Sequence, residues 1–427
     1  MLHDGKPGER ARGAVSPRRR KFLRGGATAL AGIAAGMAGP TALAARGDGG
    51  ELAVPESMKR EGAPVGGEPY GIPSKYEKGV VRHLRPTDKQ YFSSSSRSPL
   101  QDLDGMITPN GLFYERHHNG VPTIDPAQHR LLIHGLVEGS RLFTMEDIRR
   151  YPAQSRIHFI ECSGNPGYKV YGKTAAQANG LVSCAEWTGV MLKTVLDDVG
   201  VKPGAKWVIA EGADGAGLTR SIPLSKCLDD AMLVYGQNGE RLRPEQGYPL
   251  RVLVPGFEGN MNVKWLRRLQ VSDEPMHSRE ETSKYTDLMP DGKAREFTYV
   301  MEAKSIITSP SGGQKMRGKG YCELTGIAWS GHGKIAHVDV SVDDGKTWHR
   351  ARLQGPVLDK ALTRFRFPWN WDGAPAVIMS RATDETGYIQ PTLEQLVAVR
   401  GVNSVYHNNA MTPWRIAASG EVTNARL

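Results

Sequence analysis

The sequence has few cysteines, and no two of them are close together. Only four occur among 427 residues, namely Cys162, Cys184, Cys227 and Cys322. The lack of a C-x-x-C pair excludes zinc ribbons and cysteine-rich iron–sulfur motifs, and without C-x-x-C-H we expect no haem on this chain. A Cys184–Cys227 disulfide is compatible with an oxidising compartment, but the sequence does not decide whether it forms.

The sequence also lacks an apolar run long enough to cross a bilayer. The most apolar stretch, residues 27–38, is short and rich in Gly, and an A-x-A cleavage pattern follows at residues 42–44. Residues 16–23 precede it with an arginine run followed by Phe22-Leu23, which is a twin-arginine pattern. Residues 1–45 therefore predict a cleavable twin-arginine signal and a periplasmic protein with no membrane anchor. Because this route carries folded proteins, we expect a cofactor that is inserted before export.

Without the predicted leader, residues 1–45, the chain has no large excess of positive or negative charge. The formal net charge is +10, but residues 1–45 supply +6 of it. The remaining excess is too small to indicate binding to nucleic acid or to a membrane surface.

The rest of the chain is long enough for two domains, since roughly 380 residues exceed what one core usually holds. Residues 46–110 are rich in Gly, Pro and Ser and predict an extended N-terminal arm, either lying across the surface or partly disordered and available to a partner chain. Residues 111–295 mix strand and helix patterns, which indicates an α+β domain. Residues 296–427 alternate with period two, which indicates a β-sandwich.

Local patterns place individual elements in these domains. Thr144 is the expected N-cap of a helix over residues 145–150, and Asn238-Gly239 is a hairpin turn. Apolar spacing predicts a second helix within residues 189–199. Strands are expected at residues 130–136, 207–210, 231–235, 250–254, 336–342, 348–353, 365–369 and 376–382.

Cys162 stands where a strand gives way to a turn. Ile157, Phe159 and Ile160 form a β-prone run, and Ser-Gly-Asn-Pro-Gly follows the cysteine. A thiolate at such a place is a soft ligand for a thiophilic metal or a nucleophile. The alternative is a buried cysteine that acts only as a small hydrophobe.

Several basic residues are candidates for binding an anion. Adjacent His117 and His118 point apart on an extended segment and cannot chelate one metal together, whereas Arg116 and His118 share one side. Arg251 begins a buried strand, and Lys264 follows a Gly-containing turn, an arrangement that suits phosphate. Each could equally be a solvated surface charge.

Several short motifs occur in a fixed order along the chain, namely Arg116-x-His118, Cys162-Ser163-Gly164-Asn165, the run from Gly247 to Gly256, Asn262-Val263-Lys264-Trp265-Leu266 and Arg400-Gly401-Val402. Together they resemble the sulfite oxidase family of molybdenum enzymes, from about residue 112 to the C-terminus. Within that family the separate export signal, the missing haem segment and the long arm are most similar to the molybdenum subunits of sulfane dehydrogenases.

The resemblance implies a sulfite oxidase fold followed by an immunoglobulin-like dimerisation domain, and a molybdopterin cofactor whose molybdenum is ligated by Cys162. It implies that Arg116 and Arg400 bind the substrate anion, that Tyr285 is the active-site tyrosine, and that Trp187 forms a pocket wall. The cofactor-binding residues that it implies are Tyr114, Arg116, His118, Cys162, Asp214, Gln246, Arg251, Asn262, Val263 and Lys264.

Two departures from the family pattern bear on the substrate. Gly167 stands where the family's sulfite oxidases have an arginine, and Gln246 stands where a histidine is common. Losing a cation weakens the binding of sulfite, so we expect oxo transfer to a larger sulfane substrate on the cysteine of a carrier protein.

The resemblance also implies partners and leaves rival functions open. It implies a c-type cytochrome subunit as electron acceptor and a homodimer formed through the C-terminal domain, giving an α2β2 assembly. The rivals are a dehydrogenase for free sulfite, an exported methionine sulfoxide reductase, against which the predicted β-sandwich counts, and a carrier or structural subunit without catalysis.

Overall fold

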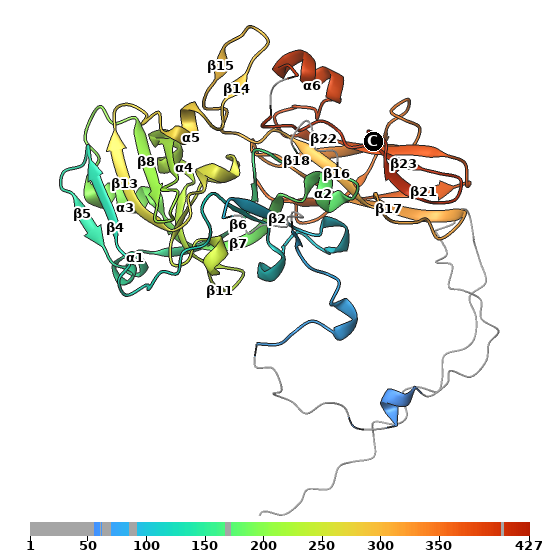
Figure 1. The fold of residues 1–427 in the computed structure, drawn as a ribbon, viewed down its shortest axis with the longest axis horizontal. Coiled ribbons are helices and arrows are strands. Elements are labelled where there is room, and N and C mark those ends of the chain that lie inside the picture. The colour runs from blue at the N-terminus through green and yellow to red at the C-terminus, as the bar shows by residue number, and fades with distance from the viewer. Residues whose placement is uncertain (1–54, 60, 62–69, 85–91, 167–171, 403–404) are drawn as a thin grey trace, which may run out of the picture. The chain divides into compact units, whose positions relative to one another are not determined.

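The computed structural model describes residues 55–59, 61, 70–84, 92–166, 172–402 and 405–427. The predicted leader and the position of Gly167 lie outside these residues. The chain divides into two units, Met1–Ile72 and Pro73–Leu427. The first unit contains one described element, the 3-10 helix Glu56–Met58. All other described elements belong to the second unit (Figure 1).

Two five-stranded sheets form the first part of the second unit. One has the order β11-β10-β7-β6 with β12 paired to β10, and the other has the order β5-β4-β13-β8-β9. The strands of the first sheet are β6 (Ala153–Glu161), β7 (Val182–Met191), β10 (Met232–Gln237), β11 (Glu240–Arg241) and β12 (Arg251–Leu253). Those of the second are β4 (Leu131–Gly135), β5 (Arg141–Phe143), β8 (Trp207–Gly212), β9 (Thr219–Pro223) and β13 (Leu266–Ser272).

The period-two pattern of β10 explains how the first sheet separates two cores. Leu233 and Tyr235 pack into the cluster that holds the helix α3 (Leu192–Val199) and the second sheet. Met232 and Val234 face the opposite cluster, against which Cys162 packs.

The helices are α1 (Met145–Arg150), α2 (Ala175–Asn179), α3 (Leu192–Val199), α4 (Leu224–Asp229), α5 (Arg279–Thr282) and α6 (Leu393–Arg400).

The C-terminal part is a β-sandwich, as the sequence predicts. Its two sheets have the orders β16-β17-β21-β20 and β19-β18-β22-β23-β24, and the chain passes between them after β17, after β19 and after β21. The strands are β16 (Lys304–Ser309), β17 (Gly320–Trp329), β18 (Ile335–Ser341), β19 (His349–Arg350), β20 (Arg352–Gln354), β21 (Thr363–Trp371), β22 (Ala376–Asp384), β23 (Trp414–Ile416) and β24 (Val422–Asn424).

The smaller elements complete the second unit. A three-stranded sheet joins β1 (His83–Leu84), β2 (Ser94–Arg97) and β3 (Glu115–His117), and β14 (Asp287–Leu288) pairs with β15 (Ala294–Arg295). The 3-10 helices of this unit are Lys75–Glu77, Leu100–Asp102, Asn110–Leu112, Pro244–Gln246 and Gly259–Met261.

Most local predictions are confirmed. Thr144 caps α1 in a capping box with Asp147. Asn238 and Gly239 have φ values of 49° and 79°, as a two-residue hairpin turn between β10 and β11 requires. The expected strands over residues 130–136, 207–210, 231–235 and 250–254 correspond to β4, β8, β10 and β12.

Three predictions of local structure need correction. The helix within residues 189–199 begins only at Leu192, because Gly189 belongs to β7 and a Cβ there would lie 2.1 Å from the Leu233 carbonyl oxygen. Residues 94–110 are not part of an extended arm. Ser94–Arg97 is the strand β2, the Ser98 hydroxyl donates to the Leu112 carbonyl at 2.9 Å, and Leu100 is buried in a core cluster. The single strand expected over residues 348–353 is interrupted at Ala351, so that β19 and β20 belong to different sheets. In addition, helix α6 was not predicted.

Candidate functional site

Strand β6 delivers Cys162 to the floor of a pocket. The strand ends at Glu161, and the Cys162 amide then donates to the Leu181 carbonyl at 2.9 Å. The Asn165 amide donates to the Cys162 carbonyl at 3.0 Å and closes the turn that the sequence predicts. Burial raises the pKa of the Cys162 thiol, an effect that Arg116 opposes.

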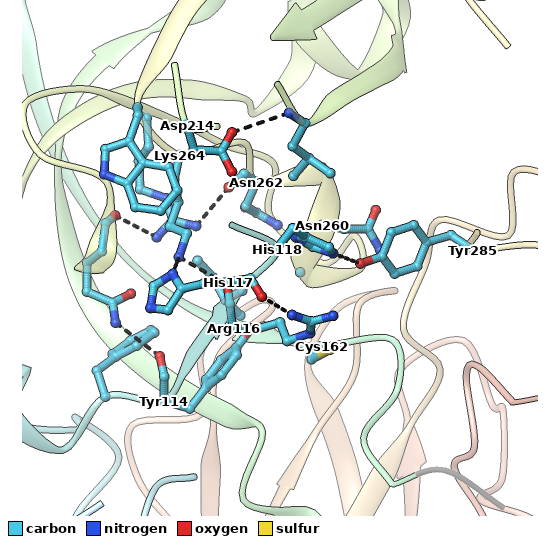
Figure 2. Close-up of a pocket in the computed structure, with 17 residues that line it drawn as sticks. Tyr114, Arg116, His117, His118, Cys162, Asp214, Asn260, Asn262, Lys264 and Tyr285 are labelled. Carbon is cyan, nitrogen blue, oxygen red and sulfur yellow. Dashed lines mark hydrogen bonds between the residues drawn. The ribbon is translucent and has the colours of Figure 1, made fainter. Parts of the chain in front are cut away.

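The pocket is partly open to solvent, and Cys162 and Tyr285 are among the side chains that line it (Figure 2). Its walls come from β3, the end of β6, the segments after β8 and α5, and the two 3-10 helices that flank β12. The predicted site residues that line it are Tyr114, Arg116, His118, Cys162, Asp214, Gln246, Arg251, Asn262, Lys264 and Tyr285.

One wall is strongly basic. The Lys264 ammonium donates to His117 Nδ1 at 2.9 Å and to the carbonyls of Arg116 and Glu245 at 3.1 and 3.0 Å. Burial, and then the charge of Arg251, holds the pKa of Lys264 well below its ordinary value. Burial together with the Lys264 and Arg116 charges lowers the pKa of His117 and of His118 to about 3. An anion in this wall would relieve the repulsion among these groups.

The opposite side presents a phenol. The Tyr285 hydroxyl lies 2.6 Å from His118 Nε2 (Figure 2). The Arg220 guanidinium lies 5.2 Å from the centre of the Tyr285 ring, and Tyr406 packs against the same ring with centroids 5.2 Å apart. Burial and the neighbouring Cys162 raise the pKa of Tyr285, so its hydroxyl stays protonated at neutral pH.

Arg251 supports the inner end of the pocket. It donates to the carbonyls of Gln246 and Asn262 at 3.0 and 2.9 Å, and the Gln246 amide donates to the Tyr114 carbonyl at 3.0 Å. Its buried Nε has no hydrogen-bond partner among the described residues. This arrangement leaves one strong donor available for a ligand.

Three predicted site residues do not line the pocket. Trp187 is fully buried behind the wall, where its indole donates to the His158 carbonyl at 3.0 Å and its ring packs on Phe113. Val263 lies in the apolar core. Arg400 is buried in ion pairs with Glu302 at 2.6 Å and Asp287 at 3.8 Å. Trp187 is thus one layer too deep to form a wall, and the charge of Arg400 is already balanced by two carboxylates.

Other lining residues escaped prediction. The most polar of these, Asn260, donates to the Ser163 hydroxyl at 3.3 Å and accepts from Arg220. The sequence feature that could have identified Asn260 as a lining residue is its position in the Gly259–Met261 turn, two residues before the predicted site residue Asn262. The full set missed is Phe113, Ile160, Leu218, Gly259, Asn260 and Trp265.

The pocket fits a group that combines an anion with a soft metal. The free donor of Arg251 and the basic wall suit phosphate and polar ring atoms, while the Cys162 thiol suits the metal. Gly259 keeps the space beside the thiol open, because a Cβ there would lie 2.8 Å from the Tyr114 hydroxyl and 3.2 Å from the Cys162 Cα. The residues present therefore fit a molybdopterin.

A buried charge network beneath Tyr285 gives a pH-dependent prediction. Glu258 bonds Arg220 at 3.0 Å and His407 at 3.2 Å. Burial alone would raise the pKa of Glu258, but Arg220 and His407 outweigh it and hold this pKa at about 2, below the ordinary 4.5. The folded-state pKa is the lower one, so the stabilisation is complete above pH 4.5 and is lost as the pH falls toward 2.

Replacing Glu258 with Gln should therefore cost about 3 kcal/mol at pH 7. In urea unfolding followed by circular dichroism, the difference from the wild type should shrink as the pH falls from 5 toward 3. The exposed pair Glu323–Arg366 supplies the control, since Glu323→Gln should cost less than about 1 kcal/mol. A Glu258→Gln deficit that stays constant across this pH range would contradict the assignment.

The remaining cysteines carry no disulfide. All four are free, and Cys184 and Cys227 lie in different core clusters. In the described part of the chain, no helix is both long and apolar enough to span a membrane.

Comparison with known proteins agrees with this geometry. Residues 118–280 match the family described as "Oxidoreductase molybdopterin binding domain", and residues 295–413 match "Mo-co oxidoreductase dimerisation domain". The chain is 34% identical over 377 residues to mitochondrial sulfite oxidase of Drosophila melanogaster, covering 78% of this chain and 64% of that protein, which is less than two thirds of its length. It is 30% identical to sulfite oxidase of Gallus gallus, covering 75% of this chain and 76% of that one.

A solved structure is more similar still. The crystal structure of the sulfane dehydrogenase SoxCD from Paracoccus pantotrophus matches with a TM-score of 0.85 and 47% identity, covering 87% of this chain and 97% of that chain. The α+β domain and the sandwich that the sequence predicts are thus those of a known architecture. The chain belongs to the sulfite oxidase family of molybdopterin-binding oxidoreductases.

Proposed function

We propose that this chain is the molybdenum subunit of a periplasmic sulfane dehydrogenase. Its substrate would be sulfane sulfur, derived from thiosulfate and held on the cysteine of a carrier protein. The observation that carries the proposal is one pocket that holds the Cys162 thiol, the Arg116 guanidinium and the Tyr285 phenol beside a basic wall.

Cys162 would ligate the metal, and Arg251, Lys264, His117 and Gln246 would hold the pterin and its phosphate. When bound, the molybdenum cofactor supplies a two-electron acceptor and the means of transferring oxygen to sulfur. Each oxygen that water contributes to the sulfur releases two electrons and two protons.

The protein groups around the thiol each have a task. Arg116 would neutralise an anionic sulfur substrate next to Cys162. Tyr285, kept protonated by burial and oriented by His118 at 2.6 Å, would donate a hydrogen bond to oxygen at the reacting centre. Arg220, below the Tyr285 ring, and the Asn260 amide would hold this side of the pocket in place.

The sulfane assignment is supported by similarity. The identity to SoxCD is 47%, against 34% and 30% for the fly and chicken sulfite oxidases. The absence of the sulfite oxidase arginine at Gly167 points the same way. A pocket with one cation fewer binds a compact dianion less well and leaves room for a longer substrate.

Partners and location follow from the same proposal. The leader at residues 1–45 would export the folded holoenzyme, and a SoxD-like c-type cytochrome subunit would take the electrons one at a time. The sandwich would mediate homodimerisation in an α2β2 complex.

Steady-state kinetics test the substrate. The holoenzyme should reduce cytochrome c with carrier-bound sulfane and show poor turnover of free sulfite and of thiosulfate without the carrier. High-affinity oxidation of free sulfite, with no response to the loaded carrier, would instead establish a sulfite dehydrogenase.

Metal and pterin analysis tests the catalytic class. Purified protein should contain near-stoichiometric molybdenum and show the fluorescence of oxidised pterin. Absence of both from protein matured in a host that makes the cofactor would leave only a carrier or structural role.

A further inference from the structure

A buried ion pair lies directly beneath the cysteine turn. Glu161, the last residue of β6, contacts the Lys304 ammonium at 2.7 Å, and the side chains are 0% and 2% exposed. Lys304 is the first residue of β16, so it comes from the sandwich. The pair therefore joins the C-terminal domain to the residue next to Cys162.

Two further groups tie this pair to the turn. The Trp329 indole of β17 donates to the second Glu161 oxygen at 2.6 Å. The Asn165 amide donates to Glu161 Oε1 at 3.0 Å, and the Lys304 ammonium donates to the Asn165 carbonyl. Residues on both sides of Cys162 are thus fixed by the same two charges.

Stability alone does not account for such a pair. Removing two charges from water is costly, and well-packed apolar residues at such positions are often as stable or more stable. What a buried, hydrogen-bonded charge pair does provide is a defined geometry, since each of its bonds has a preferred distance and direction. Here the charge pair fixes the geometry of the turn between Glu161 and Asn165.

We infer that Lys304 and Trp329 of the sandwich are positioning residues for Cys162, acting through Glu161 and Asn165. The C-terminal domain then sets the orientation of the thiol toward its metal, in addition to any part in dimerisation. The inference rests on the proposed role of Cys162 as the molybdenum ligand.

Lys304→Met in the full-length holoenzyme tests this inference against a matched variant. The control is Lys360→Met, which removes another ion pair between the two domains, Lys360–Asp230 at 2.8 Å. Both variants should lower the Tm by several degrees. Only Lys304→Met should lose bound molybdenum, change the electron paramagnetic resonance signal of the one-electron-reduced metal, and reduce kcat about tenfold.

Two results would overturn the inference. One is a Lys304→Met protein with wild-type metal content and signal, and the other is an equal change of signal in Lys360→Met. If Lys304→Met does not fold, the double variant Glu161→Gln/Lys304→Met leaves no lone buried charge and is judged by the same readouts. Failure of the proposed function is distinguishable, because the wild-type protein itself would then either lack molybdenum or oxidise free sulfite with high affinity.

Discussion

Cys162→Ser should abolish turnover while the protein remains folded. The hydroxyl is a hard, weakly acidic group and a poor substitute for the thiolate toward a soft metal, so kcat should fall by a factor on the order of 10³ or more. The change in folding stability should stay near 1 kcal/mol, because serine is slightly smaller than cysteine and the substitution leaves the backbone hydrogen bonds of residue 162 to Leu181 and Asn165 in place. Cytochrome c reduction and thermal unfolding, measured on the same preparation, separate the two effects.

The chain provides a matched control for this substitution. Cys322 is a half-buried free thiol on β17, so Cys322→Ser should keep wild-type turnover. Wild-type activity in Cys162→Ser would exclude this residue as the metal ligand and would remove the basis of the proposed function. Loss of activity in both variants would point to a general effect of thiol removal.

Arg116→Met should have the second-largest effect, and it should appear mainly in KM. Arg116 is the lining arginine whose charge acts on the Cys162 thiol, so it would contact a substrate anion before and during the reaction. Losing about 3 kcal/mol of charge-assisted binding corresponds to about a hundredfold fall in kcat/KM. Since such binding is uniform, kcat should change less than KM. Arg116→Lys should recover part of the loss.

Arg400→Met tests whether Arg400 binds the substrate anion, as the family resemblance implies, or stabilises the fold through its ion pairs, as its surroundings in the structure indicate. If Arg400 bound the substrate anion, its loss would raise KM as strongly as the loss of Arg116. The ion pairs with Glu302 and Asp287 predict instead that the main cost falls on thermal stability. Arg267→Met, at an exposed position that pairs with Glu211, controls for the loss of one positive charge. A KM in Arg400→Met that matches Arg116→Met would show that the family expectation is right.

Much of the fold was accessible from the sequence because its signals are local. The capping box at Thr144, the Asn238-Gly239 turn and the alternation along β18 act within a few residues, and each is found where it was expected. The strand β2 was missed because a run of serines carries no apolar pattern, and the strand β3 with which it pairs lies further along the chain. Helix α6 was missed because exposed Val399 blurs the helical spacing of its apolar residues.

The site was accessible in part for the same reason. Residues in short motifs, such as Cys162, His118 and Lys264, do line one pocket. Whether an arginine faces a ligand or a carboxylate depends on the fold. The motif at Arg400 therefore could not indicate that this side chain forms ion pairs with Glu302 and Asp287. The depth of Trp187 behind Phe113 is likewise a result of packing.

The contact between His118 and Tyr285 spans 167 positions of the chain, and Lys304 lies further along still. Contacts of such range carry an entropic cost, because the ends of a long segment must be brought together, and a fold rich in them forms more slowly than one built from local contacts. During synthesis, the residues that would bind a ligand therefore cannot all come together until most of the polypeptide has been made. The lining of this pocket, which runs from Phe113 to Tyr285, can therefore be complete only after the chain has been made at least as far as Tyr285.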